Sequence, residues 1–273
     1  MPPRHRRRVR PTSWKRALLR ALIAEGAHLA AIVAAAAAFL LVLHAAMRSG
    51  ERRWGGRTAS EWLPSLTSPL PAARDSALAG LRTLDPHTNR TIRVAATMLS
   101  DHDEDVATSA IHALLDAARS GGAALVVAQH EVRCALLGSD SRARANAARV
   151  AGALGKLGGS LVPALVIAGA DTAELARAAV ATALGGTLEV APLFLEQPVR
   201  RTAVAHLLSA ASDPAWLVRE AALEALFRAV PTDARVAAVV DAAIEDSSAE
   251  VRERAASIKT AMQGRGYATT NPD

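Results

Sequence analysis

Aromatic residues are scarce in this sequence and make up only 3% of its 273 residues. Ala, Leu and Val must therefore fill any core, and Ala has the highest intrinsic helix propensity. Alternating runs of Val, Ile, Thr and aromatic residues, which would indicate strands, are also hard to find. Because 51% of the residues are hydrophobic, the chain has enough apolar surface for a core. These features predict an all-α protein.

Cysteine is nearly absent too, and the single Cys134 cannot form an internal disulfide. Cysteine content therefore does not indicate an oxidising or a reducing compartment. A reactive thiol needs a basic and exposed environment. We expect Cys134 to be a small core residue on a helix instead.

Acidic residues are rare near the N-terminus. Residues 1–26 have a net charge of +7 and residues 48–57 of +3, whereas residues 58–273 have −4. Nucleic-acid binding depends on neutralising phosphates, so no nucleic-acid partner is expected for the mildly acidic main part. Basic arms can bind nucleic acid. Beside an apolar segment, however, a basic tail is better explained by anionic lipid headgroups.

Residues 26–47 form a run of 22 residues without one charge. As a helix, this run would be roughly 33 Å long, which is enough to cross the hydrocarbon layer of a bilayer. We therefore predict a single transmembrane helix that places the lipid bilayer among the partners. The residues expected to drive insertion are the larger apolar ones: Leu29, Ile32, Val33, Phe39, Leu40, Leu41, Val42 and Leu43.

Eight basic residues precede this segment and four follow it closely, so the positive-inside bias places the N-terminus in the cytoplasm. The rest of the chain would then be extracytoplasmic, that is periplasmic, although Arg48, Arg52, Arg53 and Arg57 run against this asymmetry. Two alternatives remain open for the segment: a cleaved signal peptide, or a buried Ala-rich helix of a soluble protein.

From Thr58 onward a sequence pattern typical of two helices is repeated. Self-similarity with a period of 20–50 residues indicates a solenoid. One position in each copy is usually Arg, and successive positions lie 33, 37, 33, 42 and 33 residues apart. Polar turns such as Ser212-Asp213-Pro214 precede most copies, and their Asp and Ser residues are expected to cap the following helix. The aligned series is Arg74, Ala107, Arg144, Arg177, Arg219 and Arg252.

Second helices are expected to follow after short breaks. One would start at Thr232 and another at Asn89, while a third would carry Leu125, Val126, Val132 and Leu136 in its apolar stripe. A single amphipathic pair cannot bury its stripe alone, and stacking the next pair against it completes the core. Between Arg177 and Arg219, the pair Gly185-Gly186 and two prolines are expected to interrupt the pattern.

Phrases such as Asp213-Pro214 followed by Val218-Arg219, Ala222 and Leu226 resemble the HEAT-repeat family, whose members are armadillo-like α-solenoids of stacked helix pairs. The lead-in Gly56-Arg57-Thr58 is similar to that of bacterial arrays of this type. The resemblance covers residues 58–263 and implies about five to six helix pairs. It also implies a scaffold that binds other proteins rather than an enzyme.

The expected organisation therefore has five parts. They are a basic tail with a short amphipathic helix (1–25), the transmembrane helix (26–47), a linker and lead-in (48–72), the repeat domain (73–263) and a flexible tail (264–273).

We predict a membrane-anchored scaffold or adaptor with a membrane-associated protein partner and without a small-molecule substrate. Exposed polar residues of the second helices are the predicted partner-binding residues, namely Arg90, Arg93, Gln129, Arg133 and Arg235. A structural subunit of a larger membrane complex is one alternative. An enzyme resembling HEAT-like chromophore lyases or DNA-repair proteins is another.

Three motifs partly match known binding or catalytic motifs, but each lacks a required residue. The acidic run 101–105 starts like a calcium loop, but Val106 replaces the required glycine and His112 the required glutamate. His130-Glu131 starts like a zinc-protease helix, but Cys134 replaces the second histidine. The glycines of 152–159 lack the Ser or Thr of a phosphate loop and are expected to end one helix and turn into the next. No catalytic residue, cofactor or metal is therefore expected.

Overall fold

The computed structural model describes residues 33–34, 36–41, 51–190 and 195–266. The chain divides into two compact units, Met1–Arg52 and Arg53–Asp273. In the described part of the chain all regular structure is helical, and a single isolated bridge between Trp54 and Arg57 is the only β-type pairing. The all-α class predicted from the sequence is confirmed.

Only a small part of the first unit is described. Residues 33–34 and 36–41 are helical, and Val33, Phe39, Leu40 and Leu41 are each at least 62% exposed. The other predicted membrane-spanning residues (Leu29, Ile32, Val42 and Leu43) lie outside the described residues, as does most of the segment 26–47. Within the described ranges, no helix is both long and apolar enough to span a membrane.

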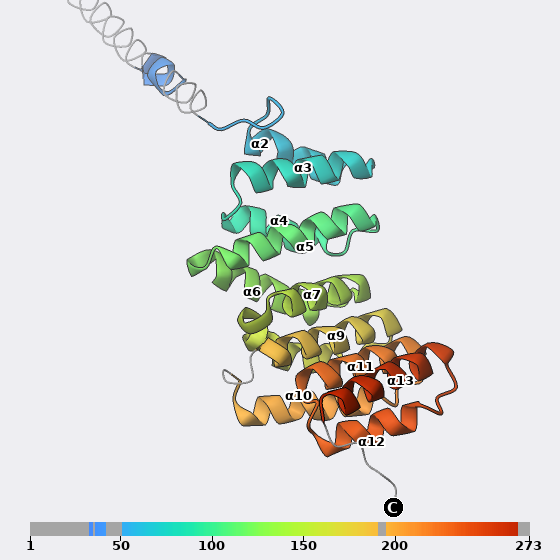
Figure 1. Ribbon diagram of the computed structural model, residues 1–273. Coiled ribbons are helices and arrows are strands. Elements are labelled where there is room, and N and C mark those ends of the chain that lie inside the picture. The colour runs from blue at the N-terminus through green and yellow to red at the C-terminus, as the bar shows by residue number, and fades with distance from the viewer. Residues whose placement is uncertain (1–32, 35, 42–50, 191–194, 267–273) are drawn as a thin grey trace, which may run out of the picture. The chain divides into compact units, whose positions relative to one another are not determined.

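The second unit is a stack of helix pairs that runs from α3 to α13 (Figure 1). In its described residues it contains five pairs and a final helix, compared with the five to six pairs that the resemblance implies. A short lead-in precedes them, formed by α2 (Ala59–Trp62) and the 3-10 helix η1 (Leu63–Thr67). The pairs are α3 (Pro71–Leu84) with α4 (Asn89–Met98), α5 (Glu104–Arg119) with α6 (Gly122–Leu136), α7 (Ser141–Ala153) with α8 (Val162–Ala168), α9 (Glu174–Val190) with α10 (Gln197–Ala210), and α11 (Trp216–Ala229) with α12 (Ala234–Ala243); α13 (Ala249–Gly264) follows.

The helices form two rows. We call α3, α5, α7, α9, α11 and α13 the arginine row, because they carry the aligned arginines, and α4, α6, α8, α10 and α12 the second row. Fully buried leucines such as Leu78, Leu114, Leu184 and Leu223 belong to one continuous core. Each pair thus covers the apolar stripe of its neighbour, as the periodicity predicts.

The lead-in closes one end of the stack. A capping box starts α2, since the backbone N–H of Thr58 donates to Glu61 at 2.8 Å. Trp62 is buried, and its indole Nε1 donates to the carbonyl of Trp54 at 3.1 Å. A Cβ at Gly80 would lie 2.8 Å from that nitrogen, so glycine lets the indole lie flat on α3.

Three local expectations are wrong. Gly185 and Gly186 do not interrupt the pattern, because they lie inside α9, where close packing offsets the low helix propensity of glycine. Val126 does not join the apolar stripe of α6 but is 64% exposed. Cys134 lies on α6 as expected, yet it is exposed rather than in the core.

Candidate partner-binding groove

The aligned arginines connect successive repeats. In Arg74, Nε and Nη2 each donate at 2.7 Å to the carboxylate of Asp101, which lies in the turn before the next helix of the arginine row. Arg177 binds Asp213, and Arg219 binds Asp246, in the same bidentate way at 2.7–2.8 Å. Arg144 donates Nε to Asp171 and Nη2 to Ser141. These four pairs form an arginine–aspartate ladder along the stack.

Each ladder arginine is also fixed at its base. The Nη1 atom of Arg219 donates to the carbonyls of Asp213 and Pro214, six and five residues earlier, at 2.9 and 3.1 Å. The other three make the same kind of contact. The ladder side chains are 0–16% exposed, and planar bidentate pairs are the strong form of charge-assisted hydrogen bond.

The ladder aspartates do not cap helices, although Asp213 and Asp246 were expected to, and other aspartates take that role. Asp213 and Asp246 lie two residues before the N-cap, and each accepts the backbone N–H of that N-cap residue at 2.8 Å. Asp103 and Asp140 do cap their helices. The hydrogen bond from Arg144 lowers the pKa of Asp171 to about 2, although burial opposes this shift. Arg74 and Arg219 likewise lower the pKa values of Asp101 and Asp246.

The ladder has one gap, between α5 and α7. Ala107 takes the place of the arginine, and Gly138, six residues before Arg144, takes the place of the aspartate. Both partners are therefore missing together. Asn146 bridges this junction instead, donating to the carbonyl of Leu99 at 2.8 Å, and Arg149 lies 3.5 Å from Glu104.

Beyond this gap, the helices of the arginine row approach each other closely. A Cβ at Gly152 of α7 would lie 2.8 Å from the Cα of Ala183 on α9. A Cβ at Gly185 of α9 would lie 2.7 Å from the Cα of Ala225 on α11. Real Cβ atoms do not come this near to another backbone, so the two glycines set the spacing of α7, α9 and α11.

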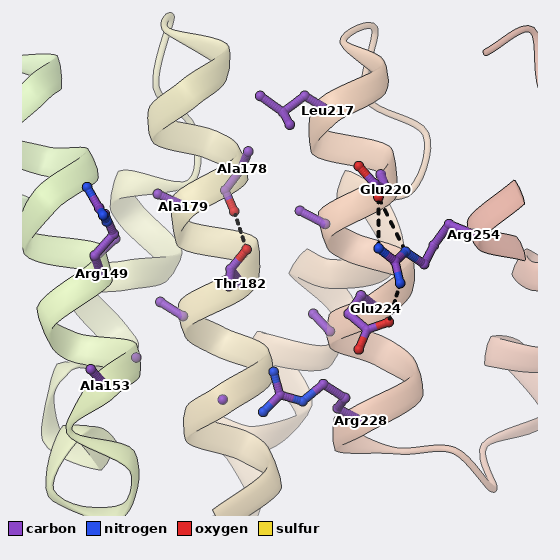
Figure 2. A pocket seen from close by; sticks show the side chains of 16 residues that line it. Arg149, Ala153, Ala178, Ala179, Thr182, Leu217, Glu220, Glu224, Arg228 and Arg254 are labelled. Carbon is purple, nitrogen blue, oxygen red and sulfur yellow. Dashed lines mark hydrogen bonds and ion pairs between the residues drawn. The ribbon is translucent and has the colours of Figure 1, made fainter. Parts of the chain in front are cut away.

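A groove of about 600 Å³ lies on this face and spans α7, α9, α11 and α13. The floor of the groove is formed by residues with short side chains or none, which on α9 are Ala178, Ala179, Thr182 and Gly186. Figure 2 shows that Ala178, Ala179 and Thr182 lie between Arg149 of α7 and the long side chains of α11. Short residues between long ones thus produce the depression.

Ion pairs hold the long side chains that border the groove. Arg254 of α13 lies 3.1 Å from Glu220 and 3.6 Å from Glu224 of α11 (Figure 2). Arg228 donates Nε to Glu189 of α9 at 2.9 Å. All these side chains are at least 26% exposed and remain accessible to a ligand. The rim therefore presents both signs of charge around an uncharged floor.

A second hollow of about 500 Å³ continues the groove at the ladder gap. It shares Arg149 and Ala179 with the first and extends to Glu104 and Ala107 on α5. Leu175 of α9 is 66% exposed beside it, and Leu217 occupies the equivalent position of α11 in the first hollow. Together the two hollows run obliquely across the arginine row from α5 to α13, and we call them the groove.

The predicted partner-binding residues lie on the second row and are not brought together. Arg90 and Arg93 are on α4, Gln129 and Arg133 on α6, and Arg235 on α12. Three of them connect neighbouring repeats: Arg93 to Glu131 at 3.3 Å, Gln129 to the carbonyl of Leu157 at 2.6 Å, and Arg133 to that of Ser160 at 3.4 Å. Arg235 pairs with Asp233 and lines a smaller hollow of about 360 Å³ between α10 and α12.

The rejected motifs of the sequence lie in ordinary structural positions. The acidic run 101–105 supplies the ladder aspartate and the cap of α5, and the glycines after α7 form a 3-10 turn, η2 (Gly155–Leu161). His130 Nε2 lies 3.7 Å from the Cys134 sulfur, one helical turn away. Over the described ranges, no group of three or more His, Cys, Asp or Glu is arranged to hold a metal ion.

No protein-family model and no curated protein matches the sequence. Several solved structures are similar in fold. One belongs to the complex of Kap95p with RanGDP, with a TM-score of 0.57 and 18% identity over 79% of this chain and 30% of that one. Importin beta has a TM-score of 0.50 and 15% identity over 75% and 28%. A designed armadillo repeat protein in complex with the peptide (KR)4 has a TM-score of 0.46 and 15% identity over 73% and 97%.

At these identities the likeness establishes the fold alone. The second unit is an α-solenoid of the HEAT and armadillo type, as the resemblance of the repeats implied.

Proposed function

We propose that the protein is a scaffold that binds a partner protein in the groove of its arginine row, and that residues 26–47 anchor it to a membrane. The observation that carries the proposal is the groove of two adjoining hollows from α5 to α13, which has a charged rim and, in the first hollow, an uncharged floor. Protein-binding sites combine an apolar centre with a polar border in this way.

The fold supports this function, since curved stacks of helices offer extended binding surfaces. Kap95p, whose complex contains a similar solenoid, binds RanGDP. The groove residues belong to the arginine row, so we place the main contact there rather than on Arg90, Arg93, Gln129, Arg133 and Arg235. These five remain candidates for a second contact on the other row.

The anchor is proposed from the charge-free run 26–47, its basic flanks and the exposed side chains of Val33, Phe39, Leu40 and Leu41. Contiguous exposed apolar side chains mark surfaces that interact with a membrane or another protein. The asymmetry of basic residues supports a cytoplasmic N-terminus and a periplasmic solenoid. Recovery of the uncut chain in a detergent-free soluble fraction would refute the anchor, and a compartment-sensitive reporter fused after Asp273 tests the orientation.

The groove is tested by photo-cross-linking in membranes of the source cells. A cross-linking amino acid replaces Thr182 on the floor in the full chain, and a second variant carries it at Ala205, which is exposed on α10 of the second row. We expect one discrete product from the groove position and none from α10. Equal products at both positions, or none at either, would contradict the proposal.

A matched pair of substitutions then tests affinity. Thr182→Trp fills the floor, whereas Ala205→Trp adds the same bulk on the opposite row. Because both sites are exposed, both variants should fold, which circular dichroism checks. Co-purification of the captured partner should fall about tenfold or more with Thr182→Trp and stay unchanged with Ala205→Trp.

A further inference from the structure

The last arginine of the series, Arg252 on α13, is held like a ladder arginine but has no aspartate. Its Nη1 atom donates to the carbonyls of Asp246 and Ser247, six and five residues earlier, at 2.7 and 3.1 Å. Arg219 makes the same two contacts at 2.9 and 3.1 Å. In the described part of the chain, no carboxylate hydrogen-bonds or ion-pairs with the Nε and Nη2 atoms of Arg252, and the residue is exposed.

The guanidinium is therefore oriented before any ligand arrives. In Arg74, Arg177 and Arg219 the corresponding Nε and Nη2 atoms bind both oxygens of an aspartate. Nearby Glu250 interacts with Arg252 through its charge rather than through a hydrogen bond, and its carboxylate accepts from the Ser248 hydroxyl at 2.6 Å. Two parallel N–H donors held in a fixed orientation, here Nε and Nη2 of Arg252, match the two oxygens of a planar carboxylate.

The surface around Arg252 suits the approach of a helix. The residues eight positions after Arg144 and Arg177 are Gly152 and Gly185, and each closely approaches the next helix of the arginine row. The residue four positions after Arg177, Ala181, is fully buried. The equivalent residues of α13 are Ala256 and Thr260, both exposed. Small side chains at these positions leave room for another backbone, as they do between α9 and α11.

We propose that Arg252, Ala256 and Thr260 form an end face that docks a second protein partner, separate from the groove. The partner is a helical protein that presents an aspartate in the turn before one of its helices. That carboxylate accepts from Nε and Nη2 of Arg252, and the helix that follows it packs on Ala256 and Thr260. The contact repeats between two polypeptides the junction that α11 makes with α13.

A second copy of this chain does not meet the requirement. At the opposite end of the stack, Ser68 takes the place of the aspartate, six residues before Arg74, and its carbonyl accepts from that arginine. The lead-in with Trp62 also covers α3 at that end. Head-to-tail stacking of copies would therefore leave Arg252 without a carboxylate.

The geometry is tested first within one chain. A copy of residues 234–266 joined after Gly266 places the copied Asp246 27 residues after Arg252, the spacing of three of the ladder pairs. We expect the urea midpoint to fall when that copied Asp is replaced by Asn, and to fall no further when Arg252→Gln is added. Additive effects of the two changes would show that the fork does not bind the carboxylate and would overturn the proposal.

The partner is tested with the full chain in membranes of the source cells, with a photo-cross-linking amino acid at Ala256. We expect one product containing a different helical protein, reduced about tenfold by Arg252→Gln. The matched exposed change Arg201→Gln on α10 should leave it unchanged. An Asp→Asn substitution in the partner's helix-start turn should cause the same loss as Arg252→Gln.

Other outcomes overturn the proposal. They are the absence of a product, a product insensitive to Arg252→Gln, a product of two copies of this chain, and a product that increases when residues 267–273 are removed. The last would assign the site to the chain's own tail. Thr182→Trp, which blocks the groove, should not change this product, so failure of the end face and failure of the groove are distinguishable.

Discussion

Arg144 and Asp171 are hydrogen-bonded across 27 residues of sequence, and the side chain of Asp171 is completely buried. Asp171 also accepts the backbone N–H of Ala173 at 2.8 Å, at the start of α9. One carboxylate therefore ties α7 to the turn that begins the next repeat. The same contact recurs at three other junctions, so the stacking register is fixed by polar contacts as well as by the apolar core.

The ladder should matter more to stability than the ion pairs of the groove rim. The α11–α13 junction contains one ladder pair, Arg219 with Asp246, and one ion pair of the groove rim, Arg254 with Glu220. Arg219 and Asp246 are 12% and 13% exposed, whereas Arg254 and Glu220 are 41% and 26% exposed. Arg219→Gln leaves a buried carboxylate without its partner, which should lower the unfolding free energy by about 3 kcal/mol. Arg254→Gln, the matched control, should cost only about 0.5 kcal/mol, because surface pairs contribute little.

Urea denaturation of both variants measures these two losses. Equal losses would mean that the ladder contributes no more than a surface ion pair.

The ladder should also make stability depend on pH in acid. Arg144 lowers the pKa of Asp171 from 3.8 to about 2 in the folded protein. Because the folded pKa is depressed, the unfolded chain takes up this proton first as the pH falls. The contribution of Asp171 is therefore complete above about pH 4 and disappears as the pH falls to about 2. The shift from 3.8 to about 2 corresponds to about 2.5 kcal/mol.

Asp171→Asn removes the titrating group, so the difference in unfolding free energy between wild type and variant should shrink between pH 4 and pH 2. A difference that stays constant over this range would exclude Asp171 as the titrating group.

The arginines of the ladder could be predicted from the sequence, whereas the sequence predicts a different role for the aspartates that bind them. Periodicity reveals the aligned arginines because they recur in five of the six copies, with Ala107 as the exception. An aspartate just before a helix is a preferred N-cap residue, so the sequence predicts that Asp213 and Asp246 cap the helices that follow them. The contacts that these aspartates make cross to another repeat. The sequence does contain a signal for them, since Asp and Arg are six residues apart in 171 and 177, 213 and 219, and 246 and 252.

The groove could not be predicted from the sequence for a different reason. Amphipathicity indicates which side of a helix is exposed, but not which row of helices carries a depression. That depends on interhelical distance, which Gly152 and Gly185 set through contacts with Ala183 and Ala225. In a linear sequence, glycines inside a helix indicate an interruption, as Gly185-Gly186 did here.

Two adjacent glycines of α9 provide a matched test of this packing. A Cβ at Gly185 would lie 2.7 Å from the Cα and Cβ of Ala225, whereas one at Gly186 would only touch the Gly152 carbonyl at 3.4 Å. Gly185→Ala should therefore lower the unfolding free energy by about 2 kcal/mol through overpacking. Gly186→Ala should be neutral or stabilise by up to about 1 kcal/mol, because alanine has the higher helix propensity. Thermal and urea denaturation would show whether the two variants differ in this direction.

The ladder gap can be filled by design. Ala107→Arg and Gly138→Asp would add both missing partners to the α5–α7 junction. Ala107→Arg alone adds an unpaired charge at a buried position and should destabilise the protein. Gly138→Asp alone lies at an exposed position, but its Cβ would lie 3.3 Å from the carbonyl of Cys134, so a smaller loss is expected. If the two side chains pair like Arg144 with Asp171, the double variant should be more stable than the sum of the single effects by about 1 kcal/mol. A double-mutant cycle in urea measures this coupling.

The same double variant connects stability to binding, because the second hollow of the groove opens at this gap beside Ala107. A new arginine there would occupy part of the hollow. We therefore expect weaker cross-linking of the groove partner from position 182 even if the two new side chains pair. Arg219→Gln followed by the same assay is the control, since it weakens the ladder without adding bulk to the groove. Unchanged cross-linking in the double variant would restrict the binding site to the first hollow, over α7 to α13.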